Sequence, residues 1–271
     1  MAITNILVVI DPTQEHQPAF NRAMQTAEET GAALHFYMCI YKESAEKGNV
    51  SDLIKQEALN EARQRLRRFS ECAEEEGIKA IQEVEWDNDW ASAIASAASR
   101  HSIDLVIKSS FAHSKAKRLL NRTSDWVILR TSPCPVLLVK REAPWQNKGI
   151  LAAVDIETAD PEHRRLNNAI ISFGMQMAGG HQADVHLVNA YQDSLKYPDR
   201  SNLLKMSGVP NQNIYIDNGS PSDVIIGRAT SLEVDLVVIG TVARHGVKGK
   251  LIGNTAEKVL DKLPCDVLAL N

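Results

Sequence analysis

The sequence contains two copies of one pattern, and this repeat constrains the fold more than any other feature. Residues 104–107 (Asp-Leu-Val-Ile) align with residues 235–238 (Asp-Leu-Val-Val), 131 positions later. Residues 133–136 (Pro-Cys-Pro-Val) align with residues 264–267 (Pro-Cys-Asp-Val) at the same offset of 131. Two separate matches at one offset indicate an internal duplication, so the chain should be read as two similar halves.

The beginnings of the two halves align at larger offsets. Residues 5–11 and 149–155 are apolar runs that end in aspartate, 144 positions apart. The next apolar runs, 33–41 and 184–191, end in tyrosines that are 150 positions apart. The second copy is therefore the shorter one between its second and fourth apolar runs.

Within each copy, short apolar runs alternate with helix-length segments, which is typical of a parallel sheet covered by helices. In the first copy the pattern predicts strands near 4–10, 33–40, 80–85, 104–109 and 135–139, and helices near 15–30, 50–76, 89–101 and 117–130. In the second copy it predicts strands near 149–154, 184–190, 213–216, 235–240 and 266–270, and helices near 162–178, 221–231 and 254–262. Residues 199–206 can add only a helix of about two turns. The predicted fold class is α/β: two tandem doubly wound, Rossmann-like domains, each with a mainly parallel five-stranded sheet flanked by helices.

Length and composition place the chain among ordinary globular proteins. We expect domains at 1–140 and 147–271, joined by a linker in which Pro144 and Trp145 interrupt regular structure. The net charge of -4 argues against a nucleic-acid partner, and no apolar run reaches the roughly 18 to 20 residues of a membrane span. Four cysteines without a Cys-x-x-Cys pair argue against a disulfide framework or a bound metal. A cytoplasmic location is therefore expected.

A glycine-rich, basic loop follows the fourth predicted strand of the second copy, from Gly240 to Gly253. In a doubly wound sheet, ligands bind outside the carboxyl ends of the strands, where the strand order reverses. Glycines let backbone N–H groups approach a phosphate, and a helix that begins at Asn254 or Thr255 presents further N–H groups and positive potential. From these residues alone, a plain connection to a capped helix is the equal alternative.

This loop resembles the nucleotide motif of the universal stress protein family, which is Gly-x-x-Gly, nine residues, then Gly-Ser or Gly-Thr. Gly240 and Gly253 occupy the first and third glycine positions, Ala243 occupies the second, and Asn254 stands where serine or threonine is usual. Residues 253–257 and 124–130 are also similar to the tandem E type of the family, which has two UspA-type domains. The resemblance covers essentially the whole chain, although residues 192–210 are fewer than the family leads us to expect.

The resemblance implies an adenine-nucleotide α-hydrolase-like fold and a stress-response protein that binds ATP or another adenine nucleotide without catalysis. It places Asp155 at the end of the first strand and the Ala190 backbone beside the base. The remaining ligand residues that it implies surround the ribose and phosphates: Gly240, Gly253, Asn254 and Thr255. The methyl group of Ala243 opposes close approach of the backbone, and Arg244 is a cationic candidate within the loop. Single domains of the family pair through their last strands, which implies an internal pseudo-dimer here, with a further homodimer left open.

The first copy lacks this motif. At the offset of 131, Ser109, Ala112, Arg122 and Thr123 stand at the positions of Gly240, Ala243, Gly253 and Asn254. No motif glycine remains, and Arg122 places a long side chain at the phosphate position. We expect a degenerate site in the first copy, kept for packing or for another ligand, and nucleotide only in the second.

Known catalytic patterns are missing from the sequence. It contains no His-Glu-x-x-His, no Walker lysine and no glycine-flanked serine elbow, and only His101 and His113 suggest themselves as a histidine pair. A ligand-binding protein that is not an enzyme is therefore the leading interpretation. The alternatives are a structural or signalling module that binds a protein or an acylated ligand, and an enzyme that shares the α-hydrolase-like architecture.

Overall fold

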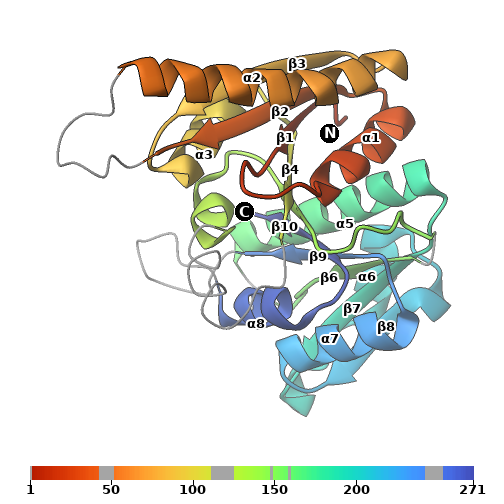
Figure 1. Ribbon diagram of the computed structural model, residues 1–271. Helices are drawn as coiled ribbons and strands as arrows, with labels where there is room; N and C mark the ends of the chain where they lie inside the picture. The colour runs from red at the N-terminus through yellow and green to blue at the C-terminus, as the bar shows by residue number, and fades with distance from the viewer. Residues whose placement is uncertain (1, 43–51, 111–124, 147–148, 158–159, 242–252) are drawn as a thin grey trace. The chain divides into compact units, whose positions relative to one another are not determined.

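The computed structural model describes residues 2–42, 52–110, 125–146, 149–157, 160–241 and 253–271 (Figure 1). The chain divides into two compact units, residues 2–142 and residues 143–271. In each unit, short strands alternate with helices and all the described strand pairs are parallel. The α/β fold class expected from the sequence is thus confirmed.

The first unit is a five-stranded sheet in the order β3-β2-β1-β4-β5. Its elements are β1 (Asn5–Val9), α1 (Pro18–Thr30), β2 (Ala33–Ile40), α2 (Asp52–Glu75), β3 (Ala80–Trp86), α3 (Trp90–Arg100), β4 (Leu105–Ser109) and β5 (Val136–Val139). Residues 125–131 are also helical. The strand order reverses between β1 and β4, so the crevice where such sheets bind ligands lies beyond the ends of these two strands.

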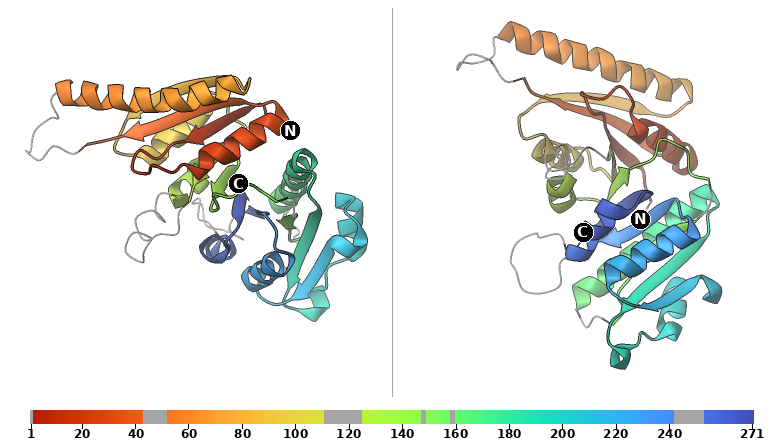
Figure 2. Two further views of the ribbon diagram at one scale, coloured as in Figure 1. Left: turned by 45° about the vertical axis from the view of Figure 1, so that its right-hand side comes forward. Right: turned by 60° about the horizontal axis from the view of Figure 1, so that its bottom comes forward.

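The second unit has the equivalent order, β8-β7-β6-β9-β10. Its elements are β6 (Ile150–Ala153), α5 (Pro161–His181), β7 (Val185–Tyr191), η1 (Ser194–Lys196), α6 (Arg200–Ser207), η2 (Asn211–Asn213), β8 (Ile214–Asn218), α7 (Pro221–Leu232), β9 (Leu236–Gly240), α8 (Asn254–Lys262) and β10 (Asp266–Leu270). Helices α7 and α8, drawn in blue, lie side by side in both views of Figure 2. The two-turn helix expected at 199–206 is present as α6.

Strands buried on both faces form the core of each unit. Every residue of β5 and β10 is buried, because parallel strands covered by helices meet little water. Helix α2 places its buried stripe, which includes Leu59, Ala62 and Leu66, along β2 and β3 (Figure 2). The helical spacing seen in the sequence therefore marks the core-facing side of this helix.

Several boundaries differ from those expected. Helix α1 begins at Pro18, because proline fits the first helical position and Gln17 precedes it as the N-cap residue. Of the helix expected at 117–130, the part before 125 lies outside the described residues. No helix of the described chain is long and apolar enough to cross a membrane.

The pairing register corrects one alignment made from sequence. In the first unit Leu7 pairs with His35, and in the second unit Leu151 pairs with His186. Since Leu7 and Leu151 are 144 positions apart, the second strands are related by an offset of 151 and not 150. The match between Tyr41 and Tyr191 was therefore wrong by one residue, which in a strand exchanges the two faces.

A pair of equivalent aspartates holds the segment that enters each sheet. Asp104 Oδ2 accepts hydrogen bonds from the Thr4 backbone N–H at 2.8 Å and the Thr4 hydroxyl at 2.7 Å. In the second unit, Asp235 Oδ2 accepts from the backbone N–H of Gln146 at 2.9 Å. Trp145 is anchored beside it, since its Nε1 donates to Asp266 Oδ2 at 2.8 Å. The expected linker residues 145 and 146 are thus fixed onto the second unit.

Candidate functional site

The sequence-derived site residues of the second unit lie at the carboxyl ends of neighbouring strands. Asp155 follows β6, Ala190 lies near the end of β7, and Gly240 is the last residue of β9. Because β9, β6 and β7 are adjacent in the sheet, these positions share one edge. Gly253 precedes α8, which begins with Asn254 and Thr255. Ala243 and Arg244 lie outside the described residues.

Two buried amide side chains, not anticipated from the sequence, fix the backbone at Asp155. Asn167 Oδ1 accepts from the Asp155 N–H at 3.1 Å, and Asn167 Nδ2 donates to the Asp155 carbonyl at 2.7 Å. Asn189 Oδ1 accepts from the Ile156 N–H at 3.0 Å, while its Nδ2 donates to the Ala190 carbonyl at 3.0 Å. Asn167 is only 5% exposed and Asn189 only 1%. An asparagine inside the apolar run 185–191 was the available sequence signal.

Packing explains Gly240 without any ligand. A Cβ atom at this position would lie 2.5 Å from Cδ2 and 3.0 Å from Cγ of Leu166 on α5. The closer separation is far below van der Waals contact, so any side chain here would displace the helix or Leu166. The first motif glycine therefore has a structural reason that is independent of phosphate.

The ends of the glycine-rich loop are tied together at the start of α8. The Gly253 N–H donates to the Thr241 carbonyl at 3.2 Å, and the Thr241 N–H donates to the Leu270 carbonyl at 2.8 Å. Gly253 is the N-cap residue of α8, and it has no side chain to cap the helix. Its φ of -66° is one that any residue adopts, so the backbone conformation does not demand glycine. A glycine here places no side chain at the positive end of the helix.

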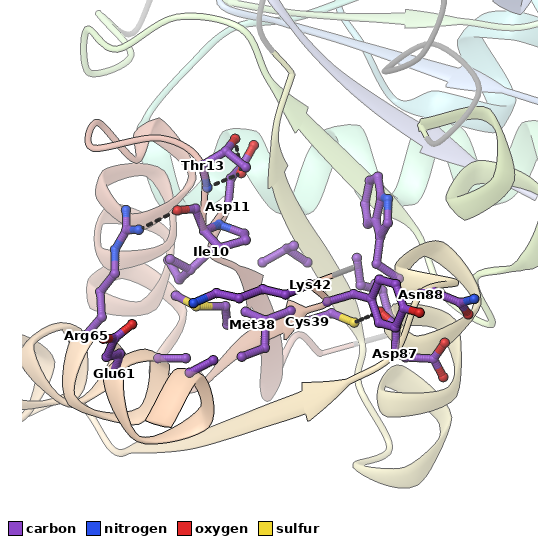
Figure 3. A pocket seen from close by; sticks show the side chains of 18 of the residues that line it. Ile10, Asp11, Thr13, Met38, Cys39, Lys42, Glu61, Arg65, Asp87 and Asn88 are labelled. Carbon is purple, nitrogen blue, oxygen red and sulfur yellow. Dashed lines mark hydrogen bonds between the residues drawn. The ribbon is translucent and has the colours of Figure 1, made fainter. Parts of the chain in front are cut away.

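The first unit contains a cavity of about 580 Å³ at its own switch point (Figure 3). The ends of β1, β2 and β4 form its walls together with α2, α3 and the two residues after β3, Asp87 and Asn88. The sequence predicted a degenerate site in this half, kept for packing or for another ligand, and did not predict a cavity. The loss of the motif glycines therefore did not close the crevice in this unit.

Internal hydrogen bonds hold the wall of this cavity at the end of β1. Gln17 accepts from the Asp11 N–H at 3.1 Å and donates to the Asp11 carbonyl at 2.8 Å. The Asp11 carboxylate accepts from the Thr13 N–H at 2.8 Å and from its hydroxyl at 2.7 Å. Arg65 of α2 donates to the Pro12 carbonyl at 2.8 Å (Figure 3). These bonds make the loop after β1 a fixed part of the site.

The cysteine of the cavity, Cys39, is not activated as a nucleophile. Cys39 donates its Sγ hydrogen to the Asp87 carbonyl at 3.4 Å. Burial raises the pKa of the Cys39 thiol to about 11, so the thiol stays protonated at neutral pH. Within the described ranges, no group of three or more His, Cys, Asp or Glu side chains could hold a metal ion. His101 bonds Glu83 through Nε2 at 2.6 Å, and His113 lies outside the described residues.

An ion pair distinguishes the first unit from the second at the end of β4. Lys108 Nζ lies 2.7 Å from Asp125 Oδ1, and their side chains are 14% and 16% exposed. The same ammonium donates to the Ser109 carbonyl at 3.0 Å and lies 5.4 Å from the centre of the Trp90 ring. At the offset of 131, Ile239 and Ala256 occupy the positions of Lys108 and Asp125. The two crevices therefore share a location but not a chemistry.

Comparison with known proteins agrees with this architecture. The model of the "Universal stress protein family" matches residues 2–140 and 202–271. Universal stress protein E of Escherichia coli (strain K12) is 31% identical, over 98% of this chain and 93% of that protein. The homologue from Haemophilus influenzae is 28% identical, over 100% of this chain and 98% of that protein.

Solved structures give the same result. A putative universal stress protein from Pseudomonas aeruginosa UCBPP-PA14 is 35% identical, with a TM-score of 0.80 over 99% of this chain and 93% of that chain. A universal stress protein from Archaeoglobus fulgidus has the same fold, with a TM-score of 0.76 at 16% identity over 98% of this chain and 96% of that chain. With a family match in both halves and full-length relatives of the same kind, the chain belongs to the universal stress protein family.

Proposed function

We propose that this stress protein is a cytoplasmic, non-enzymatic binding protein whose second unit holds an adenine nucleotide or a related phosphate-bearing ligand. The observation that supports this proposal is the start of α8. Gly253 leaves the helix N-terminus without a side-chain cap and is held by its bond to the Thr241 carbonyl. Unpaired N–H groups and the helix dipole at such a terminus favour an anion.

The other parts of the second unit supply fixed positions around this terminus. Asn167 and Asn189 hold the backbone at Asp155 and Ala190, which the family resemblance places beside the ribose and the base. A preformed wall loses less conformational freedom when a ligand binds than a mobile one does. The departures at Ala243 and Asn254 reduce affinity in this proposal and do not abolish binding.

The test replaces Gly253 with arginine, which copies Arg122 of the first copy. Gly253→Arg places a long side chain at the helix terminus where the phosphates would lie. Because φ at this residue suits any amino acid, the fold should survive. Calorimetric titration of the full chain with ATP should then show at least a tenfold loss of affinity, which corresponds to about 1.4 kcal/mol.

Gly227→Arg is the matched control. Gly227 lies exposed on α7, and a Cβ there would meet nothing within 4 Å, so the variant adds the same charge and bulk away from the site. This control should bind ATP like the parent protein. Equal affinity in Gly253→Arg and Gly227→Arg would place the nucleotide elsewhere. Absence of ATP binding in the parent would favour a module that binds a protein or an acylated ligand.

A further inference from the structure

The cavity of the first unit has the size and the apolar inner wall of a small-molecule site. Its volume of about 580 Å³ lies within the range of roughly 300–1,000 Å³ that is usual for ligand pockets. Its inner wall is apolar and includes Ile10, Met38, Ala62 and Ile94, all of them buried. A ligand in this cavity would therefore bury mainly apolar surface.

The described residues of the cavity wall carry as many positive as negative charges. The negative ones are Asp11, Glu61 and Asp87, and the positive ones are Lys42, Arg65 and Lys108. A ligand with several negative charges would meet three carboxylates at close range, without the loop glycines that admit phosphate in the family motif. These described residues therefore disfavour a polyphosphate.

Two of the three cations already have partners. Arg65 bonds the carbonyls of Pro12 and Gln14, and Lys108 is paired with Asp125. Lys42 is exposed, and the structure shows no partner for its ammonium among the described residues. Figure 3 shows its side chain reaching across the cavity from the side of Asp87 toward that of Arg65. Lys42 is thus the cation best placed to meet an anionic group of a ligand.

A buried hydroxyl group adds an unused donor to the same wall. Ser109, at the end of β4, is 4% exposed and lines the cavity. Its oxygen accepts from the Ala19 N–H at 3.0 Å, while its own hydrogen has no acceptor within the described part of the chain. A buried donor without a partner costs free energy, which an acceptor oxygen of a ligand would recover.

The equivalent positions of the second unit are different in kind. At the offset of 151, Asn189 replaces Met38, and at the offset of 131, Gly240 replaces Ser109. The first unit thus has an apolar side chain where the second has the amide of Asn189, and a hydroxyl group where the second has a glycine. Duplication has left two crevices that suit different ligands.

We propose that the cavity of the first unit is a second ligand site, which binds a small, mainly apolar monocarboxylate. The apolar body packs on Met38 and Ile94, and the carboxylate is directed toward Lys42. This site is independent of the nucleotide site proposed for the second unit.

The test is a calorimetric titration of the full chain with octanoate, octanol and octylamine. The three share one apolar chain and differ only in the charge of the head group. Octanoate should bind about tenfold more tightly than octanol, and octylamine should bind least, because Lys42 attracts the anion and repels the cation. Equal binding of octanoate and octylamine would overturn the proposal.

Two variants assign the binding to this cavity. Lys42→Glu reverses the free charge at the surface and should remove the preference for octanoate without changing the affinity for octanol. Ala62→Phe fills the space beside α2 and should abolish the binding of all three. Lys79→Glu, an exposed lysine outside the cavity, is the matched control and should behave like the parent protein.

Competition with ATP separates this proposal from the previous one. Saturating ATP should leave octanoate binding unchanged, whether or not ATP binds the second unit. Displacement of octanoate by ATP would mean that the two compounds share one site and would overturn the proposal. Undiminished octanoate binding by Lys42→Glu and Ala62→Phe would do the same.

Discussion

The two units fix the backbone after their first strands in the same way but with different residues. Gln17, the N-cap residue of α1, bonds both the N–H and the carbonyl of Asp11. Asn167, inside α5, makes the same pair of bonds to Asp155. An amide side chain carries both N–H donors and an acceptor oxygen, which is what an unpaired peptide group needs. We call each of these pairs of hydrogen bonds a clamp. Both units have kept a clamp after the first strand, although the residue that forms it and its position differ.

The opposite happened at the ends of the fourth strands. Lys108 and Asp125 form an ion pair in the first unit, where the second unit has Ile239 and Ala256. Here the positions correspond and the chemistry does not. The scaffold at the crevice was thus retained in both units, while the side chains that meet a ligand diverged.

The largest expected effect on stability comes from removing only the aspartate of the Lys108–Asp125 ion pair. Asp125→Ala leaves the ammonium of Lys108 largely buried without its counter-charge, and should lower the free energy of unfolding by about 3 kcal/mol. Urea unfolding, followed by circular dichroism, measures the change.

The double variant Lys108→Ile/Asp125→Ala copies the second unit and serves as the control. It should regain most of the lost stability, because an apolar pair of similar size replaces a buried ion pair at little cost. If the double variant is no more stable than Asp125→Ala, the apolar arrangement of the second unit does not transfer to the first.

The clamps should show an effect of intermediate size. Asn167→Leu removes the partners of the Asp155 N–H and carbonyl, and Gln17→Leu does the same to Asp11. Each should lower the free energy of unfolding by about 2 kcal/mol, because half-buried backbone groups lose their hydrogen bonds. Hydrogen exchange at the two aspartates provides the local measurement.

A clamp is local, so each variant should accelerate exchange only in its own unit. Asn167→Asp keeps an acceptor for the Asp155 N–H but sets a buried carboxylate against the Asp155 carbonyl. It should be at least as unstable as Asn167→Leu, and an intermediate stability would show that the donated bond matters little.

A substitution at Gly240 tests the packing explanation independently of ligand binding, and its effect on stability should be smaller. Gly240→Ala forces a Cβ against Leu166 and should lower the free energy of unfolding by about 1–2 kcal/mol. Leu166→Ala in the same chain should relieve the clash, and a double-mutant cycle measures the coupling. Additive effects of the two changes would contradict the packing explanation.

The fold could be predicted from the sequence because the repeat and the apolar runs carry redundant information. Anchors at one offset fixed the number of units, and alternating strands and helices fixed the fold class. The register of the second strand was missed by one residue, since a tyrosine match gives no information about which face a side chain occupies. Only the hydrogen-bonded ladder distinguishes offsets of 150 and 151.

The site could be predicted less completely. The strand-end positions of Asp155 and Gly240 followed from the general rule for doubly wound sheets. The clamps were missed because Asn167 and Gln17 stand at different distances from their aspartates, and no local pattern links them. The cavity of the first unit was not predicted, because its walls come from β1, β2 and β4, from the residues after β3 and from two helices, which no local pattern links.

The smallest expected effect is the pH dependence of stability caused by a histidine at the same register in each unit. His35 and His186 pair with Leu7 and Leu151, and neither Nδ1 atom has a hydrogen-bond partner among the described residues. Burial lowers the pKa of both side chains below 6.5. The charge of His101 lowers the pKa of His35 further, whereas Glu83 raises it.

The sign of the pH effect follows from these directions. Between its lowered folded pKa and 6.5, each histidine binds more protons in the unfolded chain than in the native protein. The free energy of unfolding should therefore be highest above pH 6.5 and fall as the pH drops through that window. Its slope against pH should correspond to at most one proton per histidine. His35→Phe and His186→Phe should each flatten the slope measured by urea unfolding at a series of pH values. If only one of them does so, the two units differ in how far these equivalent positions are buried, although the strand register is the same.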